Sequence, residues 1–265
     1  MLKTIALGSL ALLGAARPAG ADDAFATRWA EAPKSEARLV AASAGLAALE
    51  IRLKPGAITY WRDPGDAGLP PTFDFSGSTN LVSAEPVFPA PKRIPESDGS
   101  VAYGYDSDVT IPIRVVPADA ALPVKLALAL HYAVCEKVCL PAEARLSLAL
   151  PVRTTTPNAA LIEAALALAP QPRTLAELGA SLAPLGATEW RFCAPAEPGA
   201  KRDLFVEAPE GWWMTAKPEP TADGRACFRI DLAGKPDGAD LPVEARLTLT
   251  GGGSAFETRA TLAAQ

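Results

Sequence analysis

The sequence is poor in the features with which proteins bind nucleic acids or cross membranes. Its 25 lysines and arginines are outnumbered by 30 aspartates and glutamates, which gives a formal net charge of −5, and no basic run interrupts this balance. A nucleic-acid partner requires a basic face, so none is expected. After the first 21 residues, the most apolar windows, 122–150 and 159–169, are interrupted by charged side chains. We therefore expect no membrane span in the mature chain.

Residues that commonly bind metals are also scarce. The chain holds a single histidine, His131, and four cysteines. A structural zinc site uses four ligands. His131 precedes Cys135 by four residues of a predicted strand, which is ~13 Å if extended. We therefore expect His131 to be an ordinary surface histidine, and we expect no cofactor.

The first 21 residues have the composition of a secretory signal peptide. Lys3 supplies a positive charge, residues 5–16 are apolar, and Ala19 and Ala21 are small residues at −3 and −1 of a cleavage site before Asp22. An uncleaved membrane anchor is the alternative, but the apolar run is short for a span, which needs ~20 residues. The sequence predicts export and a periplasmic location, where disulfides persist.

Short segments in which apolar and polar residues alternate occur along most of the chain. Such alternation is typical of half-buried strands, because successive side chains point to opposite faces of a sheet. Most of the 26 prolines and 20 glycines fall between these segments. The pattern predicts an all-β protein built on a β-sandwich. The segments lie near residues 49–53, 109–115, 126–130, 146–150, 204–206, 227–232, 243–249 and 256–262.

Helical signals are confined to one stretch, which divides the chain into two domains. Thr156 and Pro157 can begin a helix, and Thr174 and Glu177 have the spacing of a capping box, with prolines between the two short helices. We interpret this stretch as a helical linker. The expected division is a signal peptide over residues 1–21, a first β-sandwich over 22–153, the linker over 154–186 and a second, smaller β-sandwich-like domain over 187–265.

Two similar octets lie in the two predicted domains. "PAEARLSL" at 141–148 and "PVEARLTL" at 242–249 agree at six of eight positions. Either the sandwich was duplicated and only the first copy kept a cysteine pair, or two edge-type strands have drifted to similar patterns.

The segment "HYAVCEKVCLPAEA", residues 131–144, carries Cys135 and Cys139. If strand alternation continues through it, both cysteines lie on the less apolar face and are accessible rather than buried. Four extended residues span ~13 Å, whereas the Cα atoms of a disulfide lie roughly 4.4–6.8 Å apart. The chain must therefore turn back over residues 136–138, as a tight hairpin loop or one helical turn. A disulfide over so short a loop constrains little chain entropy, and its exposure suits exchange chemistry.

From the residues alone, this pair is a structural disulfide, a Cu(I) clip of two thiolates, or a redox centre. Cys193 and Cys227 differ, because each lies within an apolar, strand-like run, "EWRFCAP" and "RACFRI". In an oxidising compartment we interpret them as one structural disulfide between strands, with two buried free thiols as the alternative.

Four segments, taken in order, resemble one known family. They are "TYWRDPGDAGLPPTFDFSGSTN" at 59–80, "VFPAPKRI" at 87–94, "YGYDSDVTIPIRV" at 103–115 and "HYAVCEKVCLPAEARLSLALP" at 131–151. These segments are similar to the periplasmic N-terminal domain of DsbD-type thiol–disulfide reductases, especially the branch related to suppressor-of-copper-sensitivity membrane reductases. The resemblance covers roughly residues 46–152. Longer members of that branch also carry a second sandwich-like domain.

The resemblance implies an immunoglobulin-like sandwich that works as a protein-disulfide-reductase-like relay. Cys135 and Cys139 match the family's redox pair, and Cys139 matches the cysteine that forms the mixed disulfide. The implied partners are a thioredoxin-like domain or membrane electron transporter, which reduces the pair, and oxidised periplasmic proteins, which the pair reduces. The sequence shows neither a membrane-spanning conduit nor a thioredoxin-like domain, so we expect a separate protein to supply the electrons.

Members of this family also shield the pair with a loop that bears aromatic side chains. The candidates here are Tyr60, Trp61, Tyr103 and Tyr105. We expect at least two of the four to be buried core residues instead. Two alternatives to the relay stay open: a periplasmic copper-tolerance module that binds Cu(I) through Cys135 and Cys139, and a scaffold without chemistry.

Overall fold

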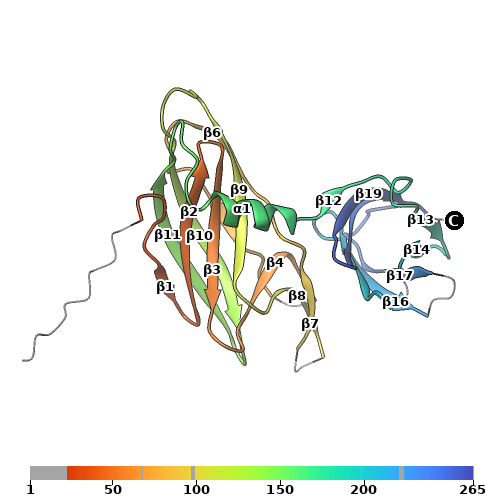
Figure 1. The fold of residues 1–265 in the computed structure, drawn as a ribbon. Coiled ribbons are helices and arrows are strands. Elements are labelled where there is room, and N and C mark those ends of the chain that lie inside the picture. Colours follow the sequence, from red (N-terminus) through yellow and green to blue (C-terminus); the bar gives the residue numbers. More distant parts are fainter. Residues whose placement is uncertain (1–22, 67, 97–98, 198, 221–223, 265) are drawn as a thin grey trace, which may run out of the picture.

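The computed structural model describes residues 23–66, 68–96, 99–197, 199–220 and 224–264. These residues form many β-strands and one short helix, arranged as two sandwiches side by side (Figure 1). The predicted all-β fold class, a β-sandwich followed by a smaller one, is confirmed. The predicted signal peptide, residues 1–21, lies outside the described residues. No helix in the described ranges has the length and apolar character needed to cross a bilayer.

The first sandwich consists of two largely antiparallel sheets that share one core. One sheet has the strand order β1-β2-β3-β9-β6, and the other has β11-β10-β4-β8-β7 with β5 paired to β10. The strands of the first sheet are β1 (Ala30–Ala32), β2 (Ser35–Ser43), β3 (Leu46–Leu53), β9 (Val109–Pro117) and β6 (Leu81–Pro86). Those of the second are β11 (Cys139–Ala149), β10 (Lys125–Cys135), β4 (Ile58–Gly65), β8 (Val101–Tyr105), β7 (Lys92–Pro95) and β5 (Thr72–Asp74).

Strands β10 and β11 have the alternation that the sequence predicted. The even-numbered residues 126–134 of β10 and 142–148 of β11 are buried, and they pack in the core between the sheets. Burial of each large apolar side chain contributes roughly 1.5–3 kcal/mol, and a shift of one residue would expose all of them. The alternation therefore fixes which residues face outward, and Cys135 and Cys139 are among them.

The helix α1 (Ala159–Ala167) packs on the outside of the first sandwich. Its buried residues Ala159 and Ile162 contact Val40, Ala42 and Ala48, which belong to β2 and β3. Figure 1 shows α1 lying across the sheet that contains β2, β3 and β9, with its far end directed toward the second sandwich. The first half of the predicted linker is thus a helix that the first sandwich holds in place.

The prediction of a second helix in the linker is wrong. Thr174 and Glu177 do form the reciprocal hydrogen bonds of a capping box, but residues 175–179 make only a turn, which ends at Gly179 with φ of 58°. The flanking segments, β12 (Gln171–Pro172) and β13 (Ser181–Pro184), pair with strands of the second sandwich. Only eight residues, 173–180, separate the two strands, which is too few for a stable helix.

The second sandwich has two four-stranded sheets. Their strand orders are β12-β19-β18-β15 and β13-β14-β17-β16. The strands not yet given are β14 (Glu189–Pro195), β15 (Arg202–Glu207), β16 (Trp213–Glu219), β17 (Arg225–Gly234), β18 (Val243–Gly251) and β19 (Phe256–Leu262). Of the two similar octets, one lies in β11, at a sheet edge, and the other in β18, which pairs on both sides. They occupy different places in their sheets, and β18 is not an edge strand.

One aromatic side chain joins the two sandwiches. Phe205 comes from β15 of the second sandwich, yet it is only 1% exposed and packs in the core of the first. Its ring lies edge-on to Trp61 and Tyr103, with centroid distances of 5.9 and 4.8 Å. The Phe205 ring excludes water from Trp61 and Tyr103. The contact between the two sandwiches is therefore desolvated at this point.

Two arginines of the first sandwich surround this contact. Arg62 donates from Nε and Nη2 to both carboxylate oxygens of Glu207 at 2.8 Å and also pairs with Glu257. Arg93 donates to the carboxylate of Asp203 and to the carbonyl oxygen of Leu204. The Arg62–Glu207 pair is bidentate and part-buried, so it fixes orientation as well as adding attraction.

Candidate functional site

The candidate site is the end of the β10–β11 hairpin. Cys135 and Cys139 are directly opposed in the register of the two strands, and residues 136–138 form the loop between them. Their Cα atoms lie 4.1 Å apart and their sulfurs form a disulfide. The chain therefore turns back as a tight hairpin loop, the first of the two geometries that the spacing allowed.

The two cysteines differ in exposure. Cys139 is exposed, but Cys135 is only 4% exposed, so the expectation that both are accessible is wrong for Cys135. Its place on the outer face was predicted correctly; what covers that face was not. The end of β10 pairs with β4 through Val134 and Thr59, and Tyr60 of β4 then packs over Cys135. One sulfur is thus presented to solvent and the other is held underneath.

Tyr60 makes polar contact with both sulfurs. Its hydroxyl oxygen lies 2.8 Å from Sγ of Cys135 and 3.2 Å from Sγ of Cys139. A disulfide has no hydrogen, so the phenol is the donor in this state. The Tyr60 side chain is itself buried, and a Cβ atom placed on Gly68, whose φ is +116°, would lie 2.3 Å from its ring. Only glycine allows the backbone at residue 68 to approach the ring so closely.

The other three aromatic candidates lie elsewhere. Trp61 and Tyr105 are buried in the core of the first sandwich, and the Tyr105 hydroxyl donates to the carbonyl oxygen of Pro89 at 2.8 Å. Burial raises the pKa of Tyr105 well above its ordinary value. Tyr103 packs against Phe205 at the contact between the sandwiches. Tyr60 is the one candidate of the four that the structure places against the cysteine pair.

The surroundings of the hairpin loop carry charges of both signs. Glu136, beside Cys135 in the loop, forms an ion pair with Lys34 at 2.8 Å. Hydrogen bonding and attraction from Lys34 lower the pKa of the Glu136 carboxyl. His131 is exposed and pairs with Glu143 at 3.3 Å, on the neighbouring strand. In the described ranges, no group of three or more histidine, cysteine, aspartate or glutamate side chains is arranged to hold a metal ion.

Cys193 and Cys227 form a disulfide in the second sandwich. They are directly opposed on the neighbouring strands β14 and β17, and their Cα atoms lie 4.1 Å apart. The two cysteines are 34 residues apart in sequence, compared with 4 for Cys135 and Cys139. A longer closed loop restricts the unfolded chain more strongly.

The Tyr60 hydroxyl, Gly68 and Lys34 contribute to this site in ways that the local sequence did not predict. These residues lie 75, 67 and 101 positions before Cys135, and only the pairing of β4 with β10 and the packing of the β1–β2 turn bring them there. The glycine carried a usable signal, since "DPGDAGLPP" is rich in turn residues. No local pattern marks Lys34.

Residues 30–151 match the family described as thiol:disulfide interchange protein DsbD, N-terminal. This range holds every strand of the first sandwich, with Tyr60, Cys135 and Cys139. The first sandwich is a DsbD-type N-terminal domain. It is therefore a thiol–disulfide exchange module, and the resemblance found from its motifs is confirmed.

The likeness in fold extends beyond the DsbD-type domain. The crystal structure of the N-terminal periplasmic domain of ScsB from Proteus mirabilis is 21% identical, covers 91% of this chain and 99% of that chain, and has a TM-score of 0.69. At this identity the match shows a shared fold, and its coverage includes the second sandwich. A marsupial T cell receptor aligns at 10% identity over 86% of this chain and 96% of that chain, but its TM-score of 0.21 carries no argument. No curated protein matches the chain significantly.

Proposed function

We propose that the protein is a periplasmic relay that moves electron pairs through the Cys135–Cys139 disulfide. A thioredoxin-like domain or a membrane electron transporter reduces the pair, and the resulting dithiol reduces oxidised periplasmic proteins. The observation that carries the proposal is the asymmetry of the pair: Cys139 is exposed, whereas Cys135 lies buried under Tyr60. A partner can thus reach one sulfur, while the other is held in place to leave or return.

Reduction takes place in two exchanges. A partner thiolate attacks Sγ of Cys139, the Cys135–Cys139 bond breaks, and Cys135 leaves as a thiolate while a mixed disulfide joins Cys139 to the partner. The partner's second thiolate then attacks its own sulfur in that mixed disulfide and releases Cys139. The partner ends as a disulfide, and the two sulfurs of this protein take protons from solvent. Exchange is faster when the leaving sulfur is stabilised as a thiolate.

Tyr60 provides that stabilisation. Its hydroxyl lies 2.8 Å from Sγ of Cys135 before the bond breaks, so it can donate to the thiolate without moving. A hydrogen bond to a charged acceptor is worth roughly 1.5–3 kcal/mol, more than one to a neutral sulfur. In the opposite direction, the Cys139 thiolate attacks an oxidised partner, and Cys135 resolves the mixed disulfide.

A redox titration of the mature protein tests the proposal. The variant Cys193→Ser/Cys227→Ser isolates the pair, and thiol alkylation followed by intact mass counts the reduced sulfurs. We expect a midpoint between roughly −120 and −270 mV, the range of exchange proteins. A midpoint below about −300 mV, as in structural disulfides, would contradict the relay and leave the scaffold alternative.

The Cu(I) alternative uses the same two cysteines, so a separate titration distinguishes it. The reduced protein is titrated with cuprous ion under anaerobic conditions, beside Cys135→Ser and Cys139→Ser. Tight one-to-one binding that either substitution abolishes, combined with a pair that does not close to a disulfide, would favour metal handling over the relay.

A further inference from the structure

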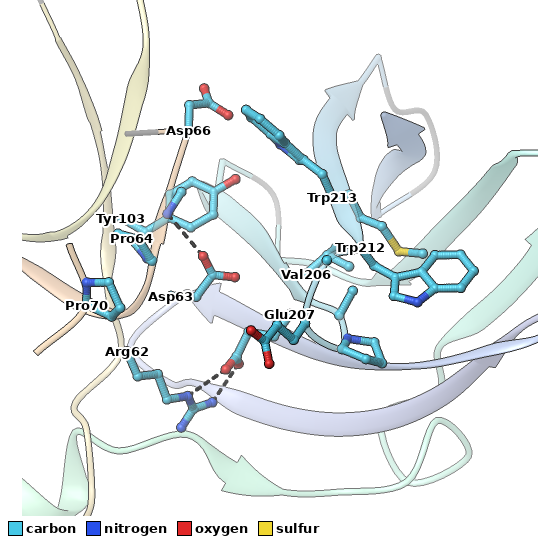
Figure 2. Close-up of a pocket in the computed structure, with 16 residues that line it drawn as sticks. Arg62, Asp63, Pro64, Asp66, Pro70, Tyr103, Val206, Glu207, Trp212 and Trp213 are labelled. Atoms are coloured by element: carbon cyan, nitrogen blue, oxygen red, sulfur yellow. Dashed lines mark hydrogen bonds and ion pairs between the residues drawn. The ribbon is translucent and has the colours of Figure 1, made fainter. Parts of the chain in front are cut away.

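A cleft lies between the two sandwiches, beside the segment that packs over Tyr60. Its volume is about 750 Å³, within the range of roughly 300–1,000 Å³ typical of ligand pockets. One wall comes from residues 62–66, Pro70 and Tyr103 of the first sandwich, and the other from residues 206–214 of the second. Figure 2 shows the side chains of the two walls on either side of the opening. Both sandwiches are needed to form it.

The cleft is strongly acidic. Its lining holds four carboxylates, Asp63, Asp66, Glu207 and Glu210, and one cation, Arg62, which gives a formal charge of −3. Arg62 is already engaged by Glu207 and by Glu257 outside the cleft. Asp63 and Asp66 accept hydrogen bonds from the backbone N–H groups of Gly65 and Val101, which do not neutralise their charge. Burial raises the pKa of Asp63, and a cation bound beside it would oppose that shift.

The second wall also presents an exposed indole ring. Trp213 is 51% exposed, and it lines the cleft together with Trp212. Figure 2 shows Trp213 projecting toward the side that carries Asp66. An exposed tryptophan beside carboxylates is a good surface for a lysine or arginine side chain, because the cation stacks on the ring while its charge pairs with the acids.

One short segment contributes both to the cleft and to the surroundings of the disulfide. The end of β4 lines the cleft with Asp63 and Gly65, and Asp66 follows directly after it. Two residues later, Gly68 packs against the ring of Tyr60. Tyr60 in turn contacts the sulfurs of Cys135 and Cys139. Gly68 and Tyr60 therefore link one wall of the cleft to the sulfur pair.

We propose that the cleft binds a cationic, extended segment of the thiol partner and so delivers the partner's thiol to Cys139. Charge complementarity selects this occupant: arginine or lysine side chains stack on Trp213 and pair with Asp66 and Glu210. Opposite charges speed encounter and fix orientation, and salt weakens both effects. The proposal rests on the proposed relay and adds the chemistry by which the second sandwich selects the partner.

The test compares two thiol probes on the full mature chain. One is the capped pentapeptide Arg-Arg-Cys-Arg-Arg, and the other is Ala-Ala-Cys-Ala-Ala. Two peptide thiols reduce the Cys135–Cys139 disulfide and become one peptide disulfide, so electrons balance. Rates are followed by alkylation and mass, and each is divided by the same peptide's rate with a small-molecule disulfide, which removes differences in thiol pKa. We expect the cationic peptide to be at least ten-fold faster in 20 mM salt, and this preference to fall below three-fold in 300 mM salt.

Variants locate the effect. In Trp213→Ala/Glu210→Gln we expect the preference at low salt to fall below three-fold. The matched control is Leu168→Ala/Glu163→Gln, which also removes an exposed apolar side chain and an exposed carboxylate but lies on and beside α1. Its preference should equal that of the unaltered protein. Thermal unfolding checks that the variants fold. If Trp213→Ala/Glu210→Gln does not fold, the single variant Glu210→Lys is used in its place.

The outcomes separate the two proposals. If neither peptide reduces the pair, the relay itself is wrong. If both reduce it at equal normalised rates, or if the preference survives in the cleft variant, the relay stands and the cleft proposal is overturned. A preference that is also lost in the control variant would show a general effect of net charge, and it too would overturn the cleft proposal.

Discussion

The hydroxyl oxygen of Tyr60 lies 2.8 Å from Sγ of Cys135, although the two residues are 75 positions apart. Strand pairing creates this contact. Ile58 and Thr59 of β4 are opposite Cys135 and Val134 of β10, and the Thr59 hydroxyl donates to the carbonyl oxygen of Ala133 at 2.9 Å. The next residue of β4 then lies over the outer face of β10, where the disulfide begins. A redox pair and its hydrogen-bond donor are thus placed by one sheet.

Replacing Tyr60 with phenylalanine should slow exchange without unfolding the protein. Phenylalanine keeps the ring that covers Cys135 but removes the only hydroxyl contacting both sulfurs among the described residues. The Cys135 thiolate then loses a hydrogen bond worth roughly 1.5–3 kcal/mol. We expect reduction by dithiothreitol to slow about ten-fold and the pKa of the freed Cys135 thiol to rise, as measured by the pH dependence of alkylation.

Tyr132→Phe is the matched control for this substitution. Tyr132 also lies on β10, but its hydroxyl bonds that of Ser35 at 2.7 Å on the core side of the sheet. Its loss should lower stability by about 1 kcal/mol and leave the exchange rate unchanged. Equal exchange rates for Tyr60→Phe and the unaltered protein would remove Tyr60 from the mechanism.

The unequal exposure of the two cysteines predicts which one traps a partner. In Cys135→Ser, the exposed Cys139 forms a mixed disulfide that position 135 can no longer resolve, so the adduct should accumulate with a partner that has only one cysteine. In Cys139→Ser, the remaining thiol is covered by Tyr60, and adducts should be at least ten-fold fewer. Incubation with a single-cysteine thioredoxin-like protein, activated as a mixed disulfide with a small thiol that leaves when Cys139 attacks, followed by non-reducing electrophoresis and mass analysis, gives the ratio. The reverse ratio would mean that Cys135 is the attacking residue.

The strands could be predicted from the sequence because their alternation is local. The burial of even positions in β10 and β11 followed directly from the order of apolar residues. The prediction of a second linker helix was wrong because the structure there depends on residues far away in the sequence. Its capping residues do interact. The segments on either side, β12 and β13, however, pair with β19 and β14, and this long-range pairing cannot be seen in the local sequence.

The cysteine pair of the site could be predicted from the sequence, but the residues that surround the pair in space could not. A cysteine pair with three residues between its members indicates a tight turn, whatever surrounds it. The burial of Cys135 depends on β4, and the choice of Tyr60 among four aromatic residues depends on the phase of that strand. The cleft depends on residues 62–66 and 70 and on residues 206–214. The packing of Phe205 in the first sandwich and the ion pairs of Arg62 and Arg93 bring these segments together.

The disulfide in the second sandwich is expected to act on stability alone. Closing a loop of about 34 residues is worth roughly 3–4 kcal/mol in the chain-entropy treatment, whereas a loop of four or five residues is worth about 2. Cys193→Ser/Cys227→Ser should therefore lower the free energy of unfolding by about that larger amount, as measured by urea titration. The midpoint potential of the other pair should not change. A shift in that potential would show that the second disulfide takes part in exchange.

Phe205→Ala should loosen the contact between the sandwiches. The substitution removes a ring that is buried against Trp61 and Tyr103, and loss of a buried phenylalanine costs roughly 3–5 kcal/mol. We expect the two sandwiches to unfold in separate transitions, with Trp61 becoming accessible to a fluorescence quencher. Phe75→Ala is the control, since Phe75 stacks on Phe73 within the first sandwich. A single unaltered transition in Phe205→Ala would mean that the ion pairs of Arg62 and Arg93 suffice.

Asp63 should make stability depend on pH in the opposite sense to most carboxylates. Its pKa is raised, chiefly by burial. Between the ordinary value of 3.8 and the raised one, the folded state binds more protons than the unfolded state, so stability falls as pH rises through this window. An asparagine side chain at this position does not titrate and can still accept the hydrogen bond from the Gly65 amide. Asp63→Asn should therefore gain stability relative to the unaltered protein as pH rises, and keep that gain at neutral pH.

Asp74 supplies a control of opposite sign for this prediction. The pKa of Asp74 is lowered, first by a hydrogen bond from the backbone of Ser76, so its stabilisation is present above the ordinary pKa and lost as pH falls. Asp74→Asn should thus lose stability at neutral pH and match the unaltered protein in acid. Urea titrations of the three proteins at several pH values between about 3 and 7 give both trends. If the Asp63→Asn difference is constant over this range, the Asp63 carboxyl titrates normally in the fold.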